Sequence, residues 1–181
     1  MPKPKPKNAH KAKAKPTPAK KKVVIAVSGG FDPIHIGHTR MFNAARALGD
    51  ELIVILNNDN WLKKKKGYAF MPEQERKEII ESLRAVDRVV LTSHEENPTD
   101  MSVCRDLERV RPDIFANGGD RTKTNIPEVA TCKAIGAKMI FGIGKEGKVQ
   151  SSSWLIEKVR EHKEIKSVTP KTGQNDQKSQ K

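Results

Sequence analysis

Two hydrophobic patterns alternate along most of the chain. Five short runs of consecutive, largely aliphatic residues occupy residues 23–27, 52–56, 88–91, 113–116 and 138–141. Continuous runs of this length are typical of strands that are buried on both faces of a sheet. The sequence therefore predicts five short strands that are covered on both sides.

Between these runs, apolar residues recur at intervals of three and four, which is the spacing of one face of an amphipathic helix. The predicted helices cover residues 38–48, 72–83 and 99–110, and two more begin at Pro127 and at Ser151. Strands that alternate with helices imply right-handed crossovers and a parallel sheet. We therefore expect one α/β domain over residues 23–162, with a Rossmann-like doubly wound sheet of about five strands. Ligands of such sheets bind beyond the carboxyl ends of the strands.

A polar stretch from Asn57 to Met71 is predicted to be a long loop at this edge of the sheet. It contains four consecutive lysines, residues 63–66, which form either a solvated face or mobile charges within reach of phosphates. Trp61 in this stretch is a candidate to stack on a base or a substrate, whereas Trp154 on the last helix is predicted to lie in the core.

The formal net charge of +13 is concentrated at the two ends of the 181-residue chain. Residues 1–22 hold nine lysines and no acid, and residues 163–181 hold five lysines and two acids, so residues 23–162 have a net charge of only +1. Both ends are poor in large apolar residues and are predicted to be disordered tails. These tails either bind polyanions weakly or are solvated without a partner, and the sequence leaves both possibilities open.

The sequence contains no apolar run of about 18 residues, and its start has no apolar stretch like the core of a secretory signal. We therefore expect a cytoplasmic protein that does not contact a membrane. The two cysteines, Cys104 and Cys132, are too few for a disulfide scaffold or a thiolate metal site. Both are expected to be buried, reduced thiols.

The connection after the first strand reads SGGFDPIHIGH and leads directly into a helix. Gly30 and Gly37 let the backbone approach a phosphate closely, and the helix N-terminus offers free amide groups. His35 and His38 lie three residues apart and can place two imidazole donors on one anion. A metal site formed by these histidines with Asp32 is an alternative, but the local spacing supplies no fourth ligand.

The HIGH segment closely resembles the HxGH signature of the cytidylyltransferase-like nucleotidyltransferase superfamily. Other stretches resemble its polyol- and sugar-phosphate branch: the region from Asn57 through the lysine run to Glu73-Gln74-Glu75-Arg76, then Val86-Asp87-Arg88-Val89-Val90, Pro112-Asp113, Gly118-Gly119-Asp120 and Ser151-Ser152-Ser153. Over about residues 23–160 the chain is similar to heptose-1-phosphate adenylyltransferases and glycerol-3-phosphate cytidylyltransferases.

This resemblance implies an enzyme that transfers a nucleoside monophosphate from a nucleoside triphosphate to a phosphorylated sugar or polyol and releases pyrophosphate. In the superfamily both histidines contact the triphosphate, so the predicted catalytic residues are His35, His38 and Lys66. The predicted nucleotide-binding residues are Gly30, Phe31, Gly37, Gly118, Gly119, Asp120, Ser151, Ser152 and Ser153. The predicted substrate-binding residues are Asp32, Lys64 and Arg76. Mg²⁺ is expected on the triphosphate itself, without a metal site in the protein, and a homodimer stays open.

The nucleobase also stays open. Cytidylyltransferases of this superfamily carry an arginine a few residues before the serine run, whereas residues 144–150 here read GKEGKVQ. Lysine lacks the bidentate fork of arginine. This departure and the heptose-like glycine loop favour ATP slightly over CTP. A phosphopantetheine-type adenylyltransferase and a non-enzymatic basic nucleic-acid-binding protein are the alternatives.

Overall fold

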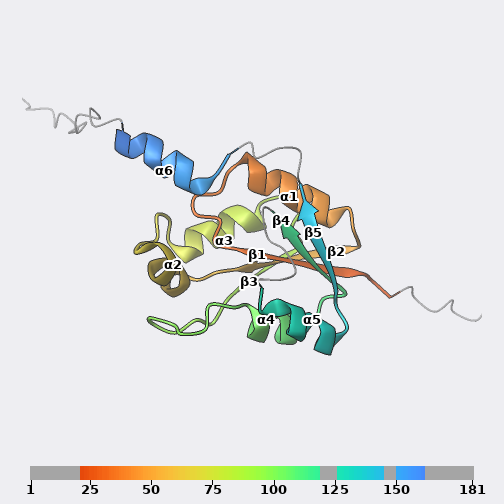
Figure 1. The fold of residues 1–181 in the computed structure, drawn as a ribbon. Coiled ribbons are helices and arrows are strands. Elements are labelled where there is room, and N and C mark those ends of the chain that lie inside the picture. Colours follow the sequence, from red (N-terminus) through yellow and green to blue (C-terminus); the bar gives the residue numbers. More distant parts are fainter. Residues whose placement is uncertain (1–20, 119–125, 145–149, 162–181) are drawn as a thin grey trace, which may run out of the picture.

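A parallel sheet of five strands runs through the middle of the protein (Figure 1). The computed structural model describes residues 21–118, 126–144 and 150–161. The strands are β1 (Val24–Gly29), β2 (Glu51–Leu56), β3 (Arg88–Leu91), β4 (Ile114–Gly118) and β5 (Lys138–Ile143), in the order β3-β2-β1-β4-β5. The predicted fold class is thereby confirmed. The predicted disordered tails, residues 1–22 and 163–181, lie outside the described residues except for Lys21 and Lys22.

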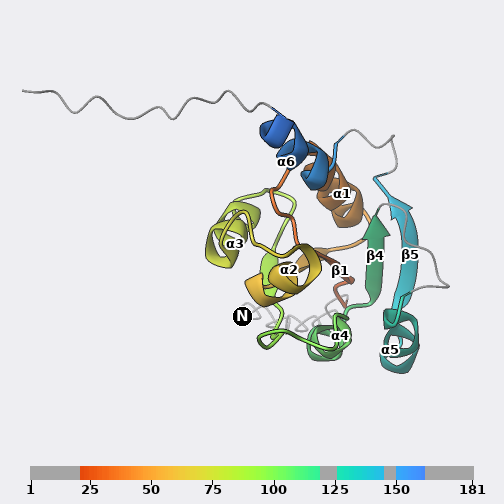
Figure 2. The same cartoon turned by 60° about the vertical axis from the view of Figure 1, so that its left-hand side comes forward.

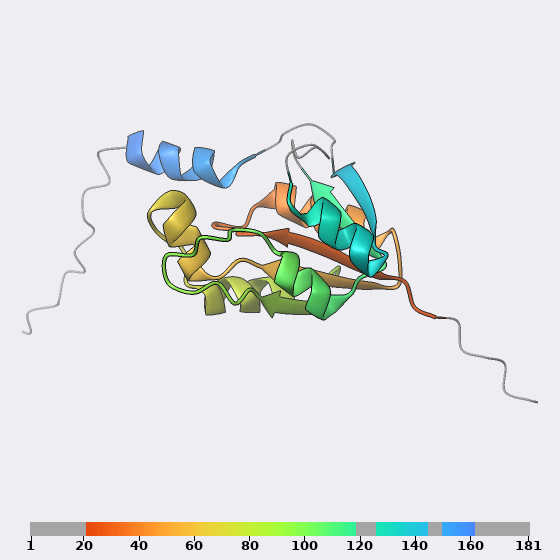
Figure 3. The same ribbon diagram turned by 60° about the horizontal axis from the view of Figure 1, so that its bottom comes forward.

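Helices cover both faces of the sheet, as Figure 2 shows from the side. They are α1 (Ile36–Arg46), α2 (Asp59–Lys66), α3 (Glu73–Glu81), α4 (Cys104–Val110), α5 (Glu128–Ile135) and α6 (Ser152–Glu161). One core cluster joins the sheet to Phe42 of α1 and Ile80 of α3, and a second joins it to Leu107 of α4 and Cys132 of α5. Figure 3 shows α4 and α5 on the near side of the sheet and α1 on its far side. No helix of the described residues is long and apolar enough to cross a membrane.

The strand order reverses at β1, which pairs with β2 on one side and with β4 on the other. The β1–β2 ladder extends over the full length of both strands, but the β1–β4 ladder ends at Ala26 and Phe115. A reversal of this kind leaves a binding position beyond the carboxyl ends of the two central strands. The carboxyl ends of β1, β2, β4 and β5 therefore lie along this edge.

The prediction of a long loop over residues 57–71 was wrong, because α2 lies within it. The side chain of Asn58 caps the helix by accepting a hydrogen bond from the backbone N–H of Trp61 at 3.0 Å. Gly67 ends the helix with a φ of 85°, in the left-handed region that glycine adopts without strain. Leu62 is the only residue of α2 that is fully buried, and the helix has only two apolar residues, Trp61 and Leu62.

The helix predicted over residues 99–110 begins only at Cys104. The residues before it lie across α2, where the indole N–H of Trp61 donates to the Met101 carbonyl at 2.8 Å and the Asn58 amide donates to the His94 carbonyl at 2.7 Å. The Trp61 indole nitrogen thus makes an internal contact. The placement of Trp154 in the core was also wrong, since this residue is 43% exposed. Both cysteines are free thiols, but Cys104 is only half-buried.

Candidate active site

Hydrogen bonds join the connection between β1 and α1 to the connection between α2 and α3. Asp32 is almost fully buried, and its two carboxylate oxygens accept the backbone N–H groups of Phe70 and Met71, each at 2.8 Å. The ammonium of Lys66 donates to the carbonyl oxygen of Asp32 at 2.9 Å. Each carboxylate oxygen of Asp32 is thus engaged by a backbone N–H group, and the predicted substrate contact of this residue stays a prediction.

The two histidines stack on one another at the start of α1. Nδ1 of His35 accepts from the backbone N–H of Gly37 at 3.1 Å, and Nδ1 of His38 accepts from the backbone N–H of His35 at 3.3 Å. The ring centroids are 3.7 Å apart, with 22° between the ring planes. Because each Nδ1 accepts, the proton of each neutral ring lies on Nε2. The rings therefore cap the helix and still present two N–H donors, and no described residue accepts a hydrogen bond from either Nε2.

Two neighbours hold this arrangement in place. A Cβ atom at Gly37 would lie 3.0 Å from the His35 ring, so a larger residue there has to displace that ring. Phe31 is buried and meets the His38 ring edge-on, with centroids 4.9 Å apart. The side chain of Phe31 thus packs beneath His38, and the approach of its backbone to a phosphate stays a prediction.

Both imidazoles are neutral at physiological pH. Burial lowers the pKa of His35 below its ordinary value. Burial, then the neighbouring His35, then the ammonium of Lys66 together lower the pKa of His38 to about 3. Neutral rings donate from Nε2 without changing their protonation state. The positive charge at this site therefore comes from Lys66 and the N-terminus of α1 rather than from the histidines.

A pH dependence of stability follows from the lowered pKa of His38. We expect the free energy of unfolding of the unsubstituted protein to fall as the pH drops from 6.5 toward 3. This fall should be steeper than that of His38→Asn by about 1 kcal/mol per pH unit. The sign follows because the unfolded chain binds this proton at a higher pH than the folded protein does. The contribution is fully present above pH 6.5 and is lost as the pH falls. Urea unfolding of both proteins across this range measures it, and parallel curves would contradict it.

Arg76 is the largest fully buried side chain of the described residues, and it joins several segments at the edge of the site. Its guanidinium donates to the carbonyl oxygens of Met71 at 2.9 Å, Gly30 at 2.7 Å and Asn57 at 2.8 Å. It also forms an ion pair of 2.6 Å with Asp59. Four of its N–H groups are therefore used inside the protein, out of the five that a guanidinium has.

The guanidinium of Arg76 is thus turned into the protein in this structure, and its contact with a substrate stays a prediction. Sequence reasoning missed Asp59, its ion-pair partner, and it missed Glu73, whose carboxylate accepts the backbone N–H of Asp59 at 2.8 Å. The signal available was Asn58 as a helix cap, followed by one acidic residue, Asp59, in the first turn of the helix.

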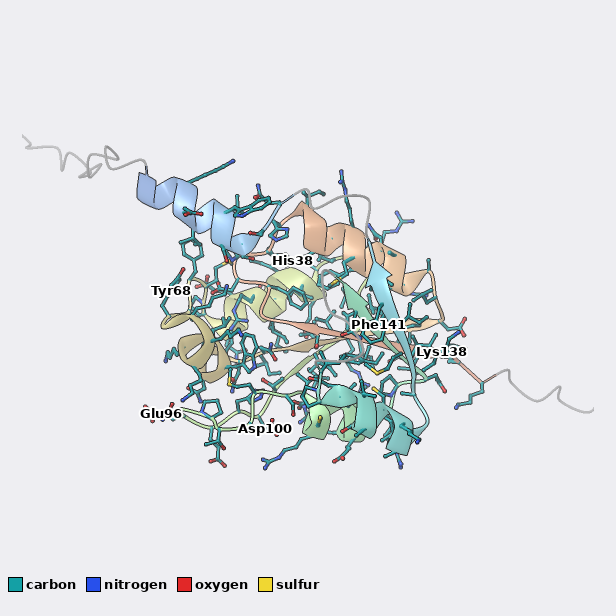
Figure 4. All side chains as sticks on the ribbon, in the orientation of Figure 1. His38, Tyr68, Glu96, Asp100, Lys138 and Phe141 are labelled. Atoms are coloured by element: carbon teal, nitrogen blue, oxygen red, sulfur yellow. The ribbon has the colours of Figure 1, made fainter. Side chains whose placement is uncertain are left out.

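The start of α6 lies against the same connection. The hydroxyl of Ser152 donates to the carbonyl oxygen of Pro33 at 2.9 Å, and the hydroxyl of Ser151 accepts from the backbone N–H of Trp154 at 3.2 Å. Figure 4 shows His38 near the start of α1, on the side where α6 begins. The structure thus brings Ser152 to the connection that carries the histidines, and the other two predicted phosphate-binding serines, Ser151 and Ser153, adjoin it in the chain.

The remaining predicted residues make other contacts or lie outside the described residues. The ammonium of Lys64 donates to the side chain of Asn97 at 2.6 Å, on the loop that crosses α2. Gly118 lies against Met41 of α1, where a Cβ atom would approach the sulfur to 2.6 Å. Gly119 and Asp120 lie outside the described residues. The described residues include no group of three His, Cys, Asp or Glu side chains placed to hold a metal ion.

Comparison with known proteins agrees with this arrangement. Residues 26–168 match the family described as cytidylyltransferase-like. The chain belongs to this family. The resemblance predicted from the HxGH motif is thereby confirmed.

Individual relatives are similar to part of the chain. A protein named FAD synthase from Pyrococcus horikoshii is 38% identical over 102 residues, which cover 56% of this chain and 66% of the relative. A protein named bifunctional protein HldE from Syntrophotalea carbinolica is 36% identical over 107 residues, which cover 58% of this chain and 21% of the relative. The match thus spans just under two thirds of the first relative and about a fifth of the second.

A solved structure shares the fold. The lipopolysaccharide core biosynthesis protein from Thermoplasma volcanium superposes with a TM-score of 0.56 at 27% sequence identity. The superposition covers 67% of this chain and 96% of that protein. The five-stranded unit described above is therefore close to the whole of that relative.

Proposed function

We propose that the protein transfers an adenylyl group from ATP to the phosphate of a phosphorylated sugar or polyol and releases pyrophosphate. The observation that carries this proposal is the pair of stacked, neutral imidazoles at the N-terminus of α1, whose Nε2–H donors are not used by the helix cap. Lys66 and the start of α6 lie beside the connection that carries them. Such a site offers several donors to one polyphosphate.

The chemistry requires no covalent intermediate. An oxygen of the acceptor's phosphate attacks the α-phosphorus of ATP, a new P–O bond forms, and the bond from the α-phosphorus to the bridging oxygen breaks in line with it. The electron pair leaves with pyrophosphate. In this proposal the Nε2–H groups of His35 and His38 donate to the oxygens on which negative charge grows. Lys66 adds a positive charge, and Ser151 to Ser153 at the start of α6 hold the departing pyrophosphate.

Mg²⁺ enters this proposal as part of the substrate, bound to the phosphates of ATP. The hydrogen-bond donors of the site suit a substrate that carries its own Mg²⁺, because imidazole N–H groups, an ammonium and serine hydroxyls bind phosphate oxygens. The carboxylate nearest to the histidines in the chain, Asp32, is occupied by two backbone N–H groups. The described part of the chain therefore contributes donors to the MgATP complex rather than a carboxylate cage.

The relatives support ATP over CTP as the nucleotide. FAD contains an AMP unit joined to the flavin part through a diphosphate, so a relative named for making FAD is compatible with adenylyl transfer. The absence of an arginine in residues 144–150 supports the same choice. Cytidylyl transfer to the same class of acceptor is the second candidate, because the family is named for that reaction.

Pyrophosphate release tests this proposal. The purified full chain is assayed with each of four nucleoside triphosphates against glycerol 3-phosphate, several sugar 1-phosphates, riboflavin 5′-phosphate and 4′-phosphopantetheine. We expect release that requires both ATP and a sugar or polyol phosphate. Release with CTP alone would overturn the choice of nucleotide, and release only with 4′-phosphopantetheine would overturn the class of acceptor. The absence of release with every pair would overturn the proposed function.

A further inference from the structure

A pocket outside the candidate active site lies between α4 and the loop that precedes this helix. Its volume is about 120 Å³, which is several times what one water molecule requires, so it has room for a small molecule. Residues between 93 and 102 form one wall, and Arg105 and Asp106 of α4 form the other. Figure 4 shows Asp100 on the side of the sheet that carries α4 and His38 on the side that carries α1. None of the residues predicted for catalysis or binding lines this pocket.

Asp106 supplies a buried carboxylate to the pocket, and one of its oxygens is free. The residue is only 4% exposed, and its Oδ1 accepts from the Arg109 guanidinium at 2.9 Å. No described residue donates a hydrogen bond to its Oδ2. Burial raises the pKa of Asp106 more than Arg109 and its other neighbours lower it. The carboxylate therefore has room for one more positively charged hydrogen-bond donor, and it lines the pocket from which such a donor can come.

Exposed side chains bring charges of both signs to the same pocket. Glu95 and Asp100 lie on the loop, and Arg105 lies opposite them on α4. The backbone N–H of Ser102 donates to Oδ1 of Asp100 at 2.9 Å, and this hydrogen bond lowers the pKa of Asp100, so its carboxylate stays ionised. Arg105 forms no ion pair with a described carboxylate, although Asp100 and Asp106 are close enough to interact with it electrostatically. The pocket thus holds an unpaired guanidinium and unpaired carboxylate oxygens.

This combination of charges discriminates between classes of ligand. A phosphate ion pairs with Arg105 but meets three carboxylates, which repel it. An organic cation pairs with the carboxylates but leaves the guanidinium without a partner. The carboxylates of the described residues are not placed to hold a metal ion. A small molecule that carries an ammonium and a carboxylate a few ångströms apart satisfies both signs of charge at once.

We infer that this pocket binds a small zwitterion, the head group of a free α-amino acid, with its ammonium at Asp106 and Asp100 and its carboxylate at Arg105. The inference goes beyond the proposed function and does not depend on it. Both ends of the ligand form charge-assisted hydrogen bonds, which are stronger than those between neutral groups. The ammonium also supplies the positive charge that the buried carboxylate of Asp106 lacks.

The pocket has a fixed floor that connects it to the candidate active site. The ring of His94 lies 2.8 Å from the Thr92 hydroxyl through Nδ1 and 3.0 Å from the Ser102 carbonyl through Nε2. A ligand therefore meets a wall that is already ordered, which lowers the cost of binding. The carbonyl of His94 accepts from the side-chain amide of Asn58, the cap of α2, at 2.7 Å. A ligand that stabilises this loop thus also stabilises the start of the helix that ends at Lys66.

Calorimetric titration of the full chain with L-alanine tests the pocket. L-Alaninamide lacks the carboxylate and N-acetyl-L-alanine lacks the ammonium, so each is a control for one end of the ligand. We expect L-alanine to bind with a Kd of about 1 mM and each control compound to bind at least about tenfold more weakly. Arg105→Gln and Asp100→Asn, which change exposed side chains, should each weaken L-alanine binding about tenfold. Arg88→Gln, at an exposed position on β3 outside the pocket, should leave it unchanged.

The outcomes separate this inference from the proposed function. No detectable binding of L-alanine, equal binding of the three compounds, or unchanged L-alanine binding in Arg105→Gln would overturn the zwitterion site. Tighter binding of L-alaninamide than of L-alanine would also overturn it and assign the pocket to an organic cation. Arg105-dependent binding of L-alanine in a protein that releases no pyrophosphate with any pair of substrates supports the pocket and contradicts the transferase.

Discussion

Replacing either histidine by asparagine is expected to lower kcat by a factor of about 10² to 10³ while the melting temperature changes little. The asparagine carbonyl oxygen takes the position of Nδ1, so it still accepts the backbone N–H that each ring now accepts. The Nε2–H donor is lost. Because this donor acts on charge that grows in the transition state, ATP affinity should change less than kcat does. Single-turnover rates and thermal unfolding are measured on His35→Asn and His38→Asn.

The matching alanine variants separate the two roles of the rings. His38→Ala removes the acceptor and the donor together, so it should lose activity to the same extent and also lose about 0.5 to 2 kcal/mol of stability. If the rings serve only as caps, the asparagine variants would keep normal kcat and only the alanine variants would be affected. An asparagine variant with unchanged kcat would remove that histidine from the mechanism.

The largest effect on stability is expected from Arg76→Met, which should lower the free energy of unfolding by about 3 to 5 kcal/mol. The substitution leaves Asp59 without its ion-pair partner and leaves three carbonyl oxygens, those of Gly30, Asn57 and Met71, without their donor. These carbonyls belong to the connections after β1, β2 and α2, so activity should fall as well. Urea unfolding and pyrophosphate release are measured on the same preparation.

The matched control for Arg76→Met lies one residue further along α3. Lys77 forms an ion pair of 3.2 Å with Glu81, one helical turn away, and both side chains are substantially exposed. Lys77→Met should therefore cost less than about 0.5 kcal/mol and leave activity unchanged. A loss of similar size in both variants would contradict the assignment of Arg76 as the residue that joins the site.

Local signals were sufficient to predict the architecture of the protein. Each strand contains a short apolar run, and the alternation of such runs with amphipathic segments gives a doubly wound sheet. The glycine-rich connection with His35 and His38, and the serine run at the start of α6, were also visible in the sequence. The sheet topology brings these two segments to one edge, where Ser152 contacts Pro33.

Long-range contacts explain what sequence reasoning missed. The contacts of Arg76 include the backbone carbonyls of Gly30 and Asn57, which lie 46 and 19 residues away in the chain, and neither carries a side-chain signal. Helix α2 has one buried residue, Leu62, so its hydrophobic pattern is too weak to distinguish it from a polar loop. Trp154 was placed in the core because an apolar residue at helical spacing usually packs, yet α6 leaves it exposed at the edge of the site.

The fate of the α-phosphorus of ATP tests the central claim most directly. Phosphorus NMR of the full chain with MgATP and a saturating polyol phosphate reports every phosphorus-containing product at once. The account predicts a new diphosphate ester that joins AMP to the acceptor, formed in equal amount with pyrophosphate, and at least a hundredfold slower formation of both with His38→Asn. Release of ADP and orthophosphate, or formation of the diphosphate ester at an undiminished rate by His38→Asn, would contradict it.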